Sequence, residues 1–258
     1  MWSRRSFVLL LALLPLVADA KPAAPVWSIG KTKITPTTIA LFSTTNANTE
    51  FTLWAAFPKQ PDKPVTLVAD GKTWTFGSSA RDGETSIVGR TIDRADATRL
   101  AGVFKVPLQE RVKLDDGLTS TWTIPPTAST RADAPLIVKL RIKNGGKATI
   151  GVSIGGRQRG PRDNRFVFAI TRNGAPVKLK DGDDFGGKMF YQALEPGEEH
   201  ELSVDLRDWA DLTAPGHYGI DARYEAELAK NGVMPTTLAE RQNVWDVALT
   251  GQGGILVQ

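Results

Sequence analysis

Four arginines form the densest local group of charges in the sequence. They are Arg157, Arg159, Arg162 and Arg165, interleaved with glycine and proline. The segment lies between two stretches that alternate apolar and polar residues, as half-buried strands do, so we expect a loop that projects from one end of a sandwich. Guanidinium groups bind carboxylates and phosphates through paired hydrogen bonds. These arginines therefore predict a surface for an anionic partner, with internal ion pairs to aspartates such as Asp163 as the alternative.

An acidic stretch supplies the second candidate site. Asp181, Asp183 and Asp184 accompany one glycine, and clustered carboxylate oxygens are ligands that calcium prefers. The glutamate that ends a twelve-residue calcium loop is missing at the corresponding position. A solvated turn is the main interpretation, so we expect no cofactor, with Ca²⁺ as the one metal that these residues suit.

Trp54 lies on the opposite side of its predicted strand from Leu53, Ala55 and Phe57. If that side faces solvent, the indole offers a stacking platform for a sugar ring or a contact for a protein partner. A central strand that is buried on both faces also explains the pattern, and it is the preferred interpretation.

The residue types that commonly act in catalysis form no recognisable catalytic pattern in this sequence. The two histidines, His200 and His217, belong to no metal-binding helix motif. The sequence also lacks a nucleophilic-serine elbow, a phosphate loop and a dinucleotide fingerprint. We predict no catalytic residues and no enzyme, although a hydrolase whose carboxylate pair comes from distant strands stays an alternative.

The first twenty residues have the features of an export signal. Arg4 and Arg5 precede an apolar run, which ends in small residues up to Ala20. The run is too short to span a bilayer and no later segment is longer, so we expect no transmembrane segment in the mature chain. The arginine pair leaves general secretory and twin-arginine export open. A periplasmic or secreted protein follows, cleaved near Ala20.

Composition narrows the class of protein further. The 258 residues include no cysteine, which excludes disulfides and thiolate metal sites. The net charge of +4 is modest and partly belongs to the signal, so nucleic acid is not an expected partner. Frequent glycine and proline without long helical periodicity predict an all-β fold.

The stretch 199–224 predicts the architecture of the C-terminal part. Two alternating strands flank a Pro215-Gly216 corner, and Tyr218 follows where immunoglobulin-like sandwiches place a tyrosine that bonds back to the corner. About seven such strands extend to the C-terminus, the last of them broken at Gly251 to Gly254. We therefore expect an immunoglobulin-like β-sandwich.

The N-terminal half predicts a second β-sandwich. Its strands run from Thr38 to Ile124 and include short ones at 103–106 and 111–114, with one helix that Asp93 caps. The proline-containing stretch 124–135 has the composition of a linker. We expect a signal peptide at 1–20, an N-terminal β-sandwich domain at 21–128 and a C-terminal immunoglobulin-like domain at 129–258.

Turn motifs in the C-terminal half resemble those of immunoglobulin-like modules in exported bacterial proteins. They are Gly155-Gly156, Asp184-Phe185-Gly186-Gly187, Leu194-x-Pro196-Gly197-Glu198, and Trp209 followed by Leu212-x-x-Pro215-Gly216-x-Tyr218. These modules have no well-defined activity, so the resemblance implies a binding or structural role. We expect a non-enzymatic exported binding or accessory protein whose partner is a protein or a cell-envelope polymer. A carbohydrate-binding module that uses Trp54 is the alternative.

Overall fold

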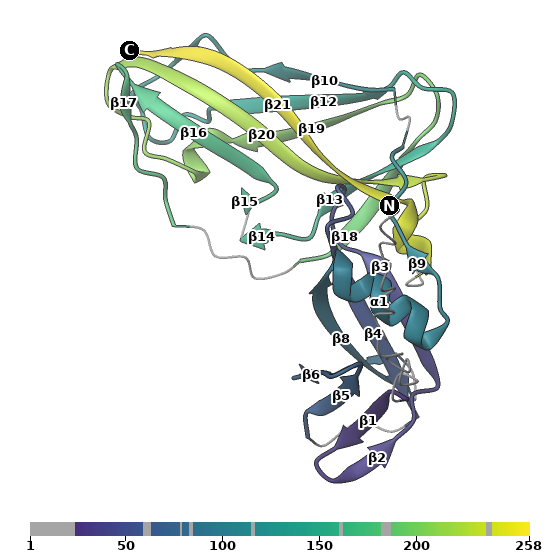
Figure 1. Cartoon of the computed structure of the whole chain (residues 1–258). Helices are drawn as coiled ribbons and strands as arrows, with labels where there is room; N and C mark the ends of the chain where they lie inside the picture. The colour runs from purple at the N-terminus through teal and green to yellow at the C-terminus, as the bar shows by residue number, and fades with distance from the viewer. Residues whose placement is uncertain are drawn as a thin grey trace, which may run out of the picture.

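The computed structural model describes residues 24–58, 63–77, 79–82, 85–114, 117–159, 162–181, 187–235 and 239–258. These residues form two β-rich units that follow one another along the chain (Figure 1). Each unit has its own buried apolar core, so the all-β prediction is confirmed. The predicted export signal lies outside the described residues.

The N-terminal unit packs two sheets against each other. One has the order β2-β1-β5-β6, made of β2 (Thr32–Ile34), β1 (Val26–Ile29), β5 (Val65–Ala69) and β6 (Lys72–Phe76). The other has the order β7-β8-β4-β3-β9, made of β7 (Ser79–Asp82), β8 (Thr85–Asp93), β4 (Glu50–Phe57), β3 (Thr38–Ser43) and β9 (Leu108–Gln109). Side chains from both sheets, among them Trp27, Phe51 and Leu67, are buried in one core, as in the predicted sandwich.

Helix α1 (Arg94–Phe104) completes this core and is the α-helix of the described residues. The Asp93 side chain accepts a hydrogen bond from the backbone N–H of Asp96 at 2.8 Å, which confirms the predicted cap. The short strands expected at 103–106 and 111–114 are wrong. Phe104 is still helical and stacks on Trp27, and β9 is the strand that follows. No helix in the described part is both long and apolar enough to cross a bilayer.

The C-terminal unit is a sandwich of two unequal sheets. The smaller has the order β10-β12-β19, made of β10 (Leu118–Thr123), β12 (Ile137–Asn144) and β19 (Glu199–Asp205). The larger follows β11-β21-β20-β13-β18, made of β11 (Thr127–Ala128), β21 (Val244–Val257), β20 (Gly216–Lys230), β13 (Ile150–Gly155) and β18 (Met189–Leu194). On its margin, β16 (Phe166–Arg172) also pairs with β20, and β17 (Ala175–Pro176) pairs with β16. In immunoglobulin lettering, β10, β12 and β19 correspond to strands A, B and E, and β21, β20 and β13 to strands G, F and C. Two such sheets facing each other are the immunoglobulin arrangement, so the predicted immunoglobulin-like sandwich is confirmed.

Two short 3₁₀ helices and a small hairpin complete the C-terminal unit. They are η1 (Leu206–Asp208), η2 (Ala239–Asn243) and the hairpin of β14 (Gln158–Arg159) and β15 (Arg162–Asp163).

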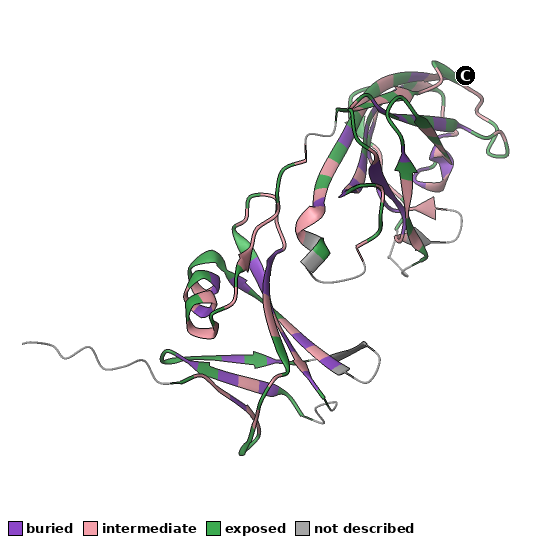
Figure 2. Ribbon diagram, turned by 90° about the vertical axis from the view of Figure 1, so that its right-hand side faces the viewer, coloured by how far each residue is buried: buried purple, intermediate pink, exposed green. Residues whose placement is uncertain are grey.

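The long strands bury alternate residues, as Figure 2 shows by colour. On the outer face of β12, Lys139 and Lys143 form ion pairs with Glu201 and Glu199 of β19, at 2.8 Å and 3.1 Å. The hydrogen bond from Lys139 lowers the pKa of Glu201 below its ordinary value. This face is thus a self-paired charged surface and offers no free charge cluster.

The tyrosine corner is present as predicted. Tyr218 is buried, and its hydroxyl donates a hydrogen bond to the carbonyl of Ala214 at 2.9 Å. Pro215 and Gly216 make the corner itself, and Gly216 has a φ of 151°. The corner fixes the start of β20, on which the larger sheet is built.

The strand at 118–123 belongs to the C-terminal unit, not to the N-terminal one. β10 pairs along its whole length with β12, and Trp122 packs against the C-terminal core. β11 likewise runs parallel to the end of β21. The expected boundary at 128 therefore cuts through the second sandwich. Its proline-containing stretch is the bend by which the chain passes from one sheet to the other.

The expected break at Gly251 to Gly254 is also wrong, because β21 continues through it to Val257. A Cβ atom at Gly251 would lie 2.3 Å from the ring of Trp122, and one at Gly253 would lie 2.8 Å from Ile124. The glycines let β10 pack directly on the backbone of β21. They are needed for close packing, not for a turn.

Replacing Tyr218 with Phe should lower the free energy of unfolding by about 1 to 2 kcal/mol, because the carbonyl of Ala214 loses its donor. Calorimetry measures this. Tyr224→Phe is the matched control, because it removes a tyrosine hydroxyl outside the corner, which donates to the carbonyl of Ser153 at 3.1 Å. An unchanged melting temperature for Tyr218→Phe would contradict the role of the corner.

Limited trypsin proteolysis should cut the chain at Lys113, in the stretch between β9 and β10, and leave 124–135 intact. A C-terminal fragment that begins near residue 114 should then unfold cooperatively on its own, since it holds a complete core. Cleavage inside 124–135, or loss of cooperative unfolding in the fragment, would contradict this division.

Candidate functional site

The arginine-rich segment interrupts a strand. β13 and β16 both pair with β20: residues 150–152 face its last residues and residues 166–172 face its first ones. Between them the chain leaves the sheet, and its described residues 156–159 and 162–164 include the β14–β15 hairpin (Figure 1). The expected loop at one end of the sandwich is therefore wrong, because the segment leaves from within the larger sheet.

Arg165 fills the gap that this excursion opens beside β20. It is 6% exposed. Its carbonyl accepts a hydrogen bond from the N–H of Glu225 at 2.9 Å, and its Nη1 donates to the carbonyl of Glu225 at 2.8 Å. Its Nε donates to the carbonyl of Gly155. One arginine thus supplies both a strand-like backbone contact and a side-chain donor, so its guanidinium has a structural role.

The other arginines of the group also have contacts within the unit. Nη1 of Arg157 forms an ion pair with Glu225 at 2.7 Å. Nη1 of Arg162 donates to the carbonyl of Lys180 at 3.1 Å, and its guanidinium lies 5.0 Å from the ring centre of Trp209. Arg159 lies in β14, and its side chain is outside the described residues. The described side chains of Arg157, Arg162 and Arg165 do not form one open patch, and an anionic partner for the hairpin stays a prediction.

Asp163, a half-buried residue of the hairpin, and the buried Tyr224 have raised pKa values. Burial raises the pKa of Asp163, whose carboxylate accepts the N–H of Arg165 at 3.0 Å. Burial also raises the pKa of Tyr224, and the charge of Asp163 adds to this effect. The phenol therefore stays protonated and serves as a hydrogen-bond donor to the sheet.

A hollow of about 450 Å³ lies beside Arg165 on the larger sheet. Three carboxylates line it, those of Glu225, Glu227 and Asp246. Glu227 and Asp246 are direct cross-strand partners, yet each is engaged elsewhere. The hydroxyl of Tyr191 donates to Glu227 at 2.8 Å, and Arg111 pairs with Asp246. The carboxylates that meet here are held by contacts of the fold.

The predicted metal ligands do not form a described site. Asp181 is exposed, whereas Asp183 and Asp184 lie outside the described residues. Within the described part, no three His, Cys, Asp or Glu side chains are grouped so that they could hold a metal. His200 lies in β19 of the smaller sheet and His217 in β20 of the larger sheet, so the fold places them on different sheets.

Trp54 lies on the outer side of β4 and is half-buried. Its cross-strand partners are Ala40 of β3 and Gly89 of β8. A Cβ atom at Gly89 would lie 2.9 Å from both Cε3 and Cζ3 of the indole. The ring therefore rests on the backbone of Gly89 and is less buried than Trp27 and Trp74 of the same unit.

A set of side-chain contacts joins the two units, and the sequence did not predict it. The amide of Asn46 pairs with the backbone of Asp246: Nδ2 donates to its carbonyl at 2.6 Å, and Oδ1 accepts its N–H at 3.1 Å. The amide of Asn48 pairs in the same way with the backbone of Arg111, at 3.1 Å and 2.8 Å. Arg111 completes the junction through its ion pair with Asp246. We call these four residues the junction clamp.

The clamp caps a strand edge. Asp246 lies in the half of β21 that has β20 on one side and no strand on the other in the described part. The Asn46 amide offers both N–H donors and an accepting carbonyl oxygen, so it satisfies both backbone groups of Asp246 at once. A polar Asn-x-Asn loop was the available signal in the sequence, but its partner is 200 residues away.

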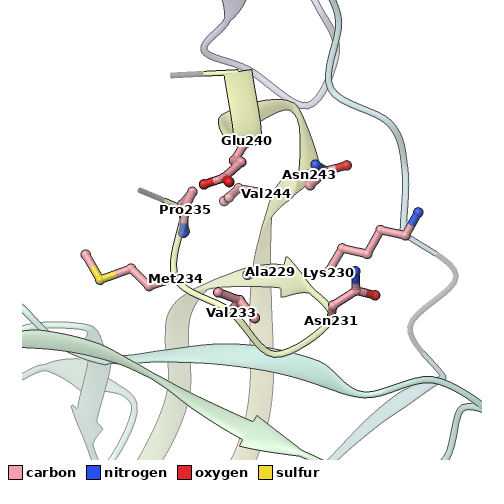
Figure 3. Close-up of a pocket in the computed structure, with 9 residues that line it drawn as sticks. All are labelled: Ala229, Lys230, Asn231, Val233, Met234, Pro235, Glu240, Asn243 and Val244. Atoms are coloured by element: carbon pink, nitrogen blue, oxygen red, sulfur yellow. The ribbon is translucent and has the colours of Figure 1, made fainter. Parts of the chain in front are cut away.

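A second hollow, of about 310 Å³, lies where the β20–β21 connection meets η2 (Figure 3). Val233 and Met234 of the connection are 63% and 43% exposed. Glu240 is the one carboxylate among its nine lining residues. The hollow combines apolar and polar side chains and holds no pair of carboxylates.

No protein-family model and no curated protein matches the chain. Among solved structures, the CARDB domain of a Pyrococcus furiosus protein in complex with di-metal ions matches with 17% identity and a TM-score of 0.24, over 57% of this chain and 94% of that one. AggA, the major subunit of aggregative adherence fimbriae type I from Escherichia coli, matches with 16% identity and a TM-score of 0.31, over 57% and 99%. A β-D-glucoside glucohydrolase from Trichoderma reesei matches with 13% identity and a TM-score of 0.24, over 61% and 21%. At such low TM-scores these likenesses carry no argument about function.

Arg165→Gln should lower the free energy of unfolding by roughly 2 to 4 kcal/mol, because the carbonyls of Gly155 and Glu225 lose buried donors. Arg157→Gln is the matched control and should cost less than about 1 kcal/mol, since it removes a half-exposed ion pair. Urea unfolding measures both. Equal and small effects would show that Arg165 does not support the sheet.

Proposed function

We propose that the chain is an exported, non-enzymatic binding or accessory protein of the bacterial envelope, which presents two β-sandwiches in a fixed relative orientation. The junction clamp is the observation that carries this proposal. A flexible linker alone would connect two independently moving domains. Here side chains of the first unit hydrogen-bond the backbone of the second, so a partner can contact both at once.

The location of the clamp supports this role. Asp246 belongs both to the clamp and to the carboxylate-lined hollow, so the surface near the hollow includes parts of both units. The side chain of Arg111 is only 10% exposed in its ion pair. A partially buried, geometrically constrained ion pair resists screening by salt better than an exposed one. The two units therefore act as one body at physiological ionic strength.

A hydrolase is the weaker proposal. In a catalytic carboxylate pair, one group must be able to donate a proton to the substrate or accept one from it. The carboxylates that the fold brings together, Glu227 and Asp246, are bound by Tyr191 and Arg111. These contacts are the kind that stabilise a fold, and they favour a binding role.

An anionic partner at the arginine hairpin remains part of the proposal in a reduced form. Arg165 is committed to the sheet, which leaves the exposed part of the hairpin for an envelope polymer or an acidic protein face. The side chain of Arg157 is 40% exposed, so a partner with carboxylate or phosphate groups can compete with Glu225 for it.

Small-angle X-ray scattering tests the fixed orientation. The double variant Asn46→Ala, Asn48→Ala should widen the distribution of interatomic distances, because the clamp loses four hydrogen bonds to backbone groups. It should also weaken retention of envelope polymer or protein on the immobilised chain at least several-fold. Asp133→Ala is the control, since it removes an exposed ion pair with Arg131 away from the clamp. An unchanged distance distribution would contradict the proposal, as would turnover of chromogenic glycosides by the wild-type chain.

A further inference from the structure

The outer face of the N-terminal sheet around Trp54 has a distinctive make-up. Its register puts Ala40 on one side of the indole and Gly89 on the other, with Ala56 two residues further along β4. Diagonally to the indole, the same register places Phe42 of β3, which is buried, and Ile87 of β8, which is half-buried. The sheet surface is therefore low directly beside the indole, and larger apolar side chains lie diagonally to it.

The orientation of the indole follows from its contact with Gly89. The site of a Cβ atom there would be nearly equidistant from three ring atoms of Trp54, at 2.9, 2.9 and 3.1 Å. A point can be this close to three consecutive ring atoms only if it lies above the ring plane. One face of the indole thus lies against Gly89, and the opposite face is directed away from Gly89.

Hydroxyl groups flank this indole on two diagonals. Thr38 of β3 and Thr91 of β8 are exposed and lie on the same face as Trp54, one on each side. Diagonal neighbours of this kind are about 7 to 8 Å apart. Neither hydroxyl is hydrogen-bonded to another described residue. Both can therefore reach the rim of a ring that is stacked on the indole.

We propose that this face binds the apolar side of an uncharged sugar ring, with Trp54 as the stacking platform and Thr38 and Thr91 as hydrogen-bonding groups at its rim. The inference deepens the proposed function and depends on it only for the view that the chain binds envelope material. An indole is amphipathic and offers a rigid, flat apolar surface, which suits a ligand with one apolar side and polar edges.

Charge favours a neutral ligand. No residue within two positions of Trp54 on this face, along β4 or across to β3 and β8, is charged. Stacking of nucleic-acid bases is normally accompanied by Lys and Arg that track the phosphates, and such residues are missing from these positions. A polyanionic glycan lacks a counter-charge here for the same reason.

Area disfavours a protein as the ligand of this face. A standard protein interface buries about 800 Å² on each partner, whereas even a whole tryptophan side chain contributes only about 150 to 250 Å². Among the described residues, the exposed large apolar side chains lie elsewhere: Val68, Val112, Ile137, Phe190, Val233 and Met234. One indole suffices for a sugar ring but not for a protein interface.

The test uses the mature chain labelled with 5-fluorotryptophan and titrated with cellohexaose, maltohexaose and chitohexaose. The ¹⁹F resonance that is missing in Trp54→Phe should shift with at least one of these sugars. Trp54→Ala should weaken its binding at least tenfold, and Thr38→Ala with Thr91→Ala about three- to tenfold. Thr121→Ala, an exposed threonine of β10, is the control and should leave binding unchanged.

Gly89→Ala adds an independent variant that keeps the indole. The new Cβ would lie 2.9 Å from the ring, so the ring must move, and affinity should fall several-fold while the melting temperature reports any loss of fold. The inference is overturned if none of the three sugars shifts the Trp54 resonance, or if Trp54→Ala binds as tightly as the wild type. The clamp variants should bind the sugar normally, because the site lies wholly in the N-terminal unit. Failure of the sugar site and failure of the proposed function are thus distinguishable.

Discussion

The backbone of β20 must be hydrogen-bonded on both sides over fifteen residues, and the larger sheet depends on how this requirement is met. β21 pairs with one side of β20 from Gly216 to Ala229. On the other side the pairing with β20 is interrupted between Val152 and Phe166. Arg165 bridges the interruption with its own carbonyl and its guanidinium, and the hydroxyl of Ser153 accepts the N–H of Glu227 at 2.7 Å. Two residues next to the gap thus replace a missing stretch of strand, which lets the hairpin extend without weakening the sheet.

This constraint changes the meaning of the arginine-rich segment. Charge density in a sequence indicates where guanidinium groups are, but not whether solvent or backbone carbonyls surround them. A buried arginine is stable only if its donors are satisfied, and Arg165 obtains this from carbonyls that the excursion itself has freed. The segment therefore combines one structural arginine with more exposed ones, and only the latter are available to a partner.

Glycine–tryptophan contacts recur in both sandwiches with different results. In the C-terminal unit, Trp122 packs on Gly251 between the two sheets and meets Phe166 and Phe168 at ring-centre distances of 5.9 and 6.5 Å. In the N-terminal unit, Trp54 packs on Gly89 on the outside of a sheet. The same local rule, a ring placed over a residue that has no Cβ, thus gives a core contact in one place and a surface platform in the other. Which result occurs depends on whether a second sheet covers the ring.

Local patterns predicted much of this fold because their physical causes are local. Alternation of apolar residues gave the strands, Asp93 gave the cap of α1, and the Pro-Gly corner gave the position of Tyr218. Errors arose where distant residues decide the outcome. The close approach of Trp122 to Gly251 turns a glycine-rich stretch into continuous strand and joins β10 to the second sandwich. In the clamp, the amides of Asn46 and Asn48 bind backbone groups that lie 200 and 63 residues away. Because backbone groups are common to all residue types, the sequence does not show where such partners lie. The unpredicted contacts are therefore the ones that set how the two sandwiches are arranged, and these determine which surfaces a partner can contact together.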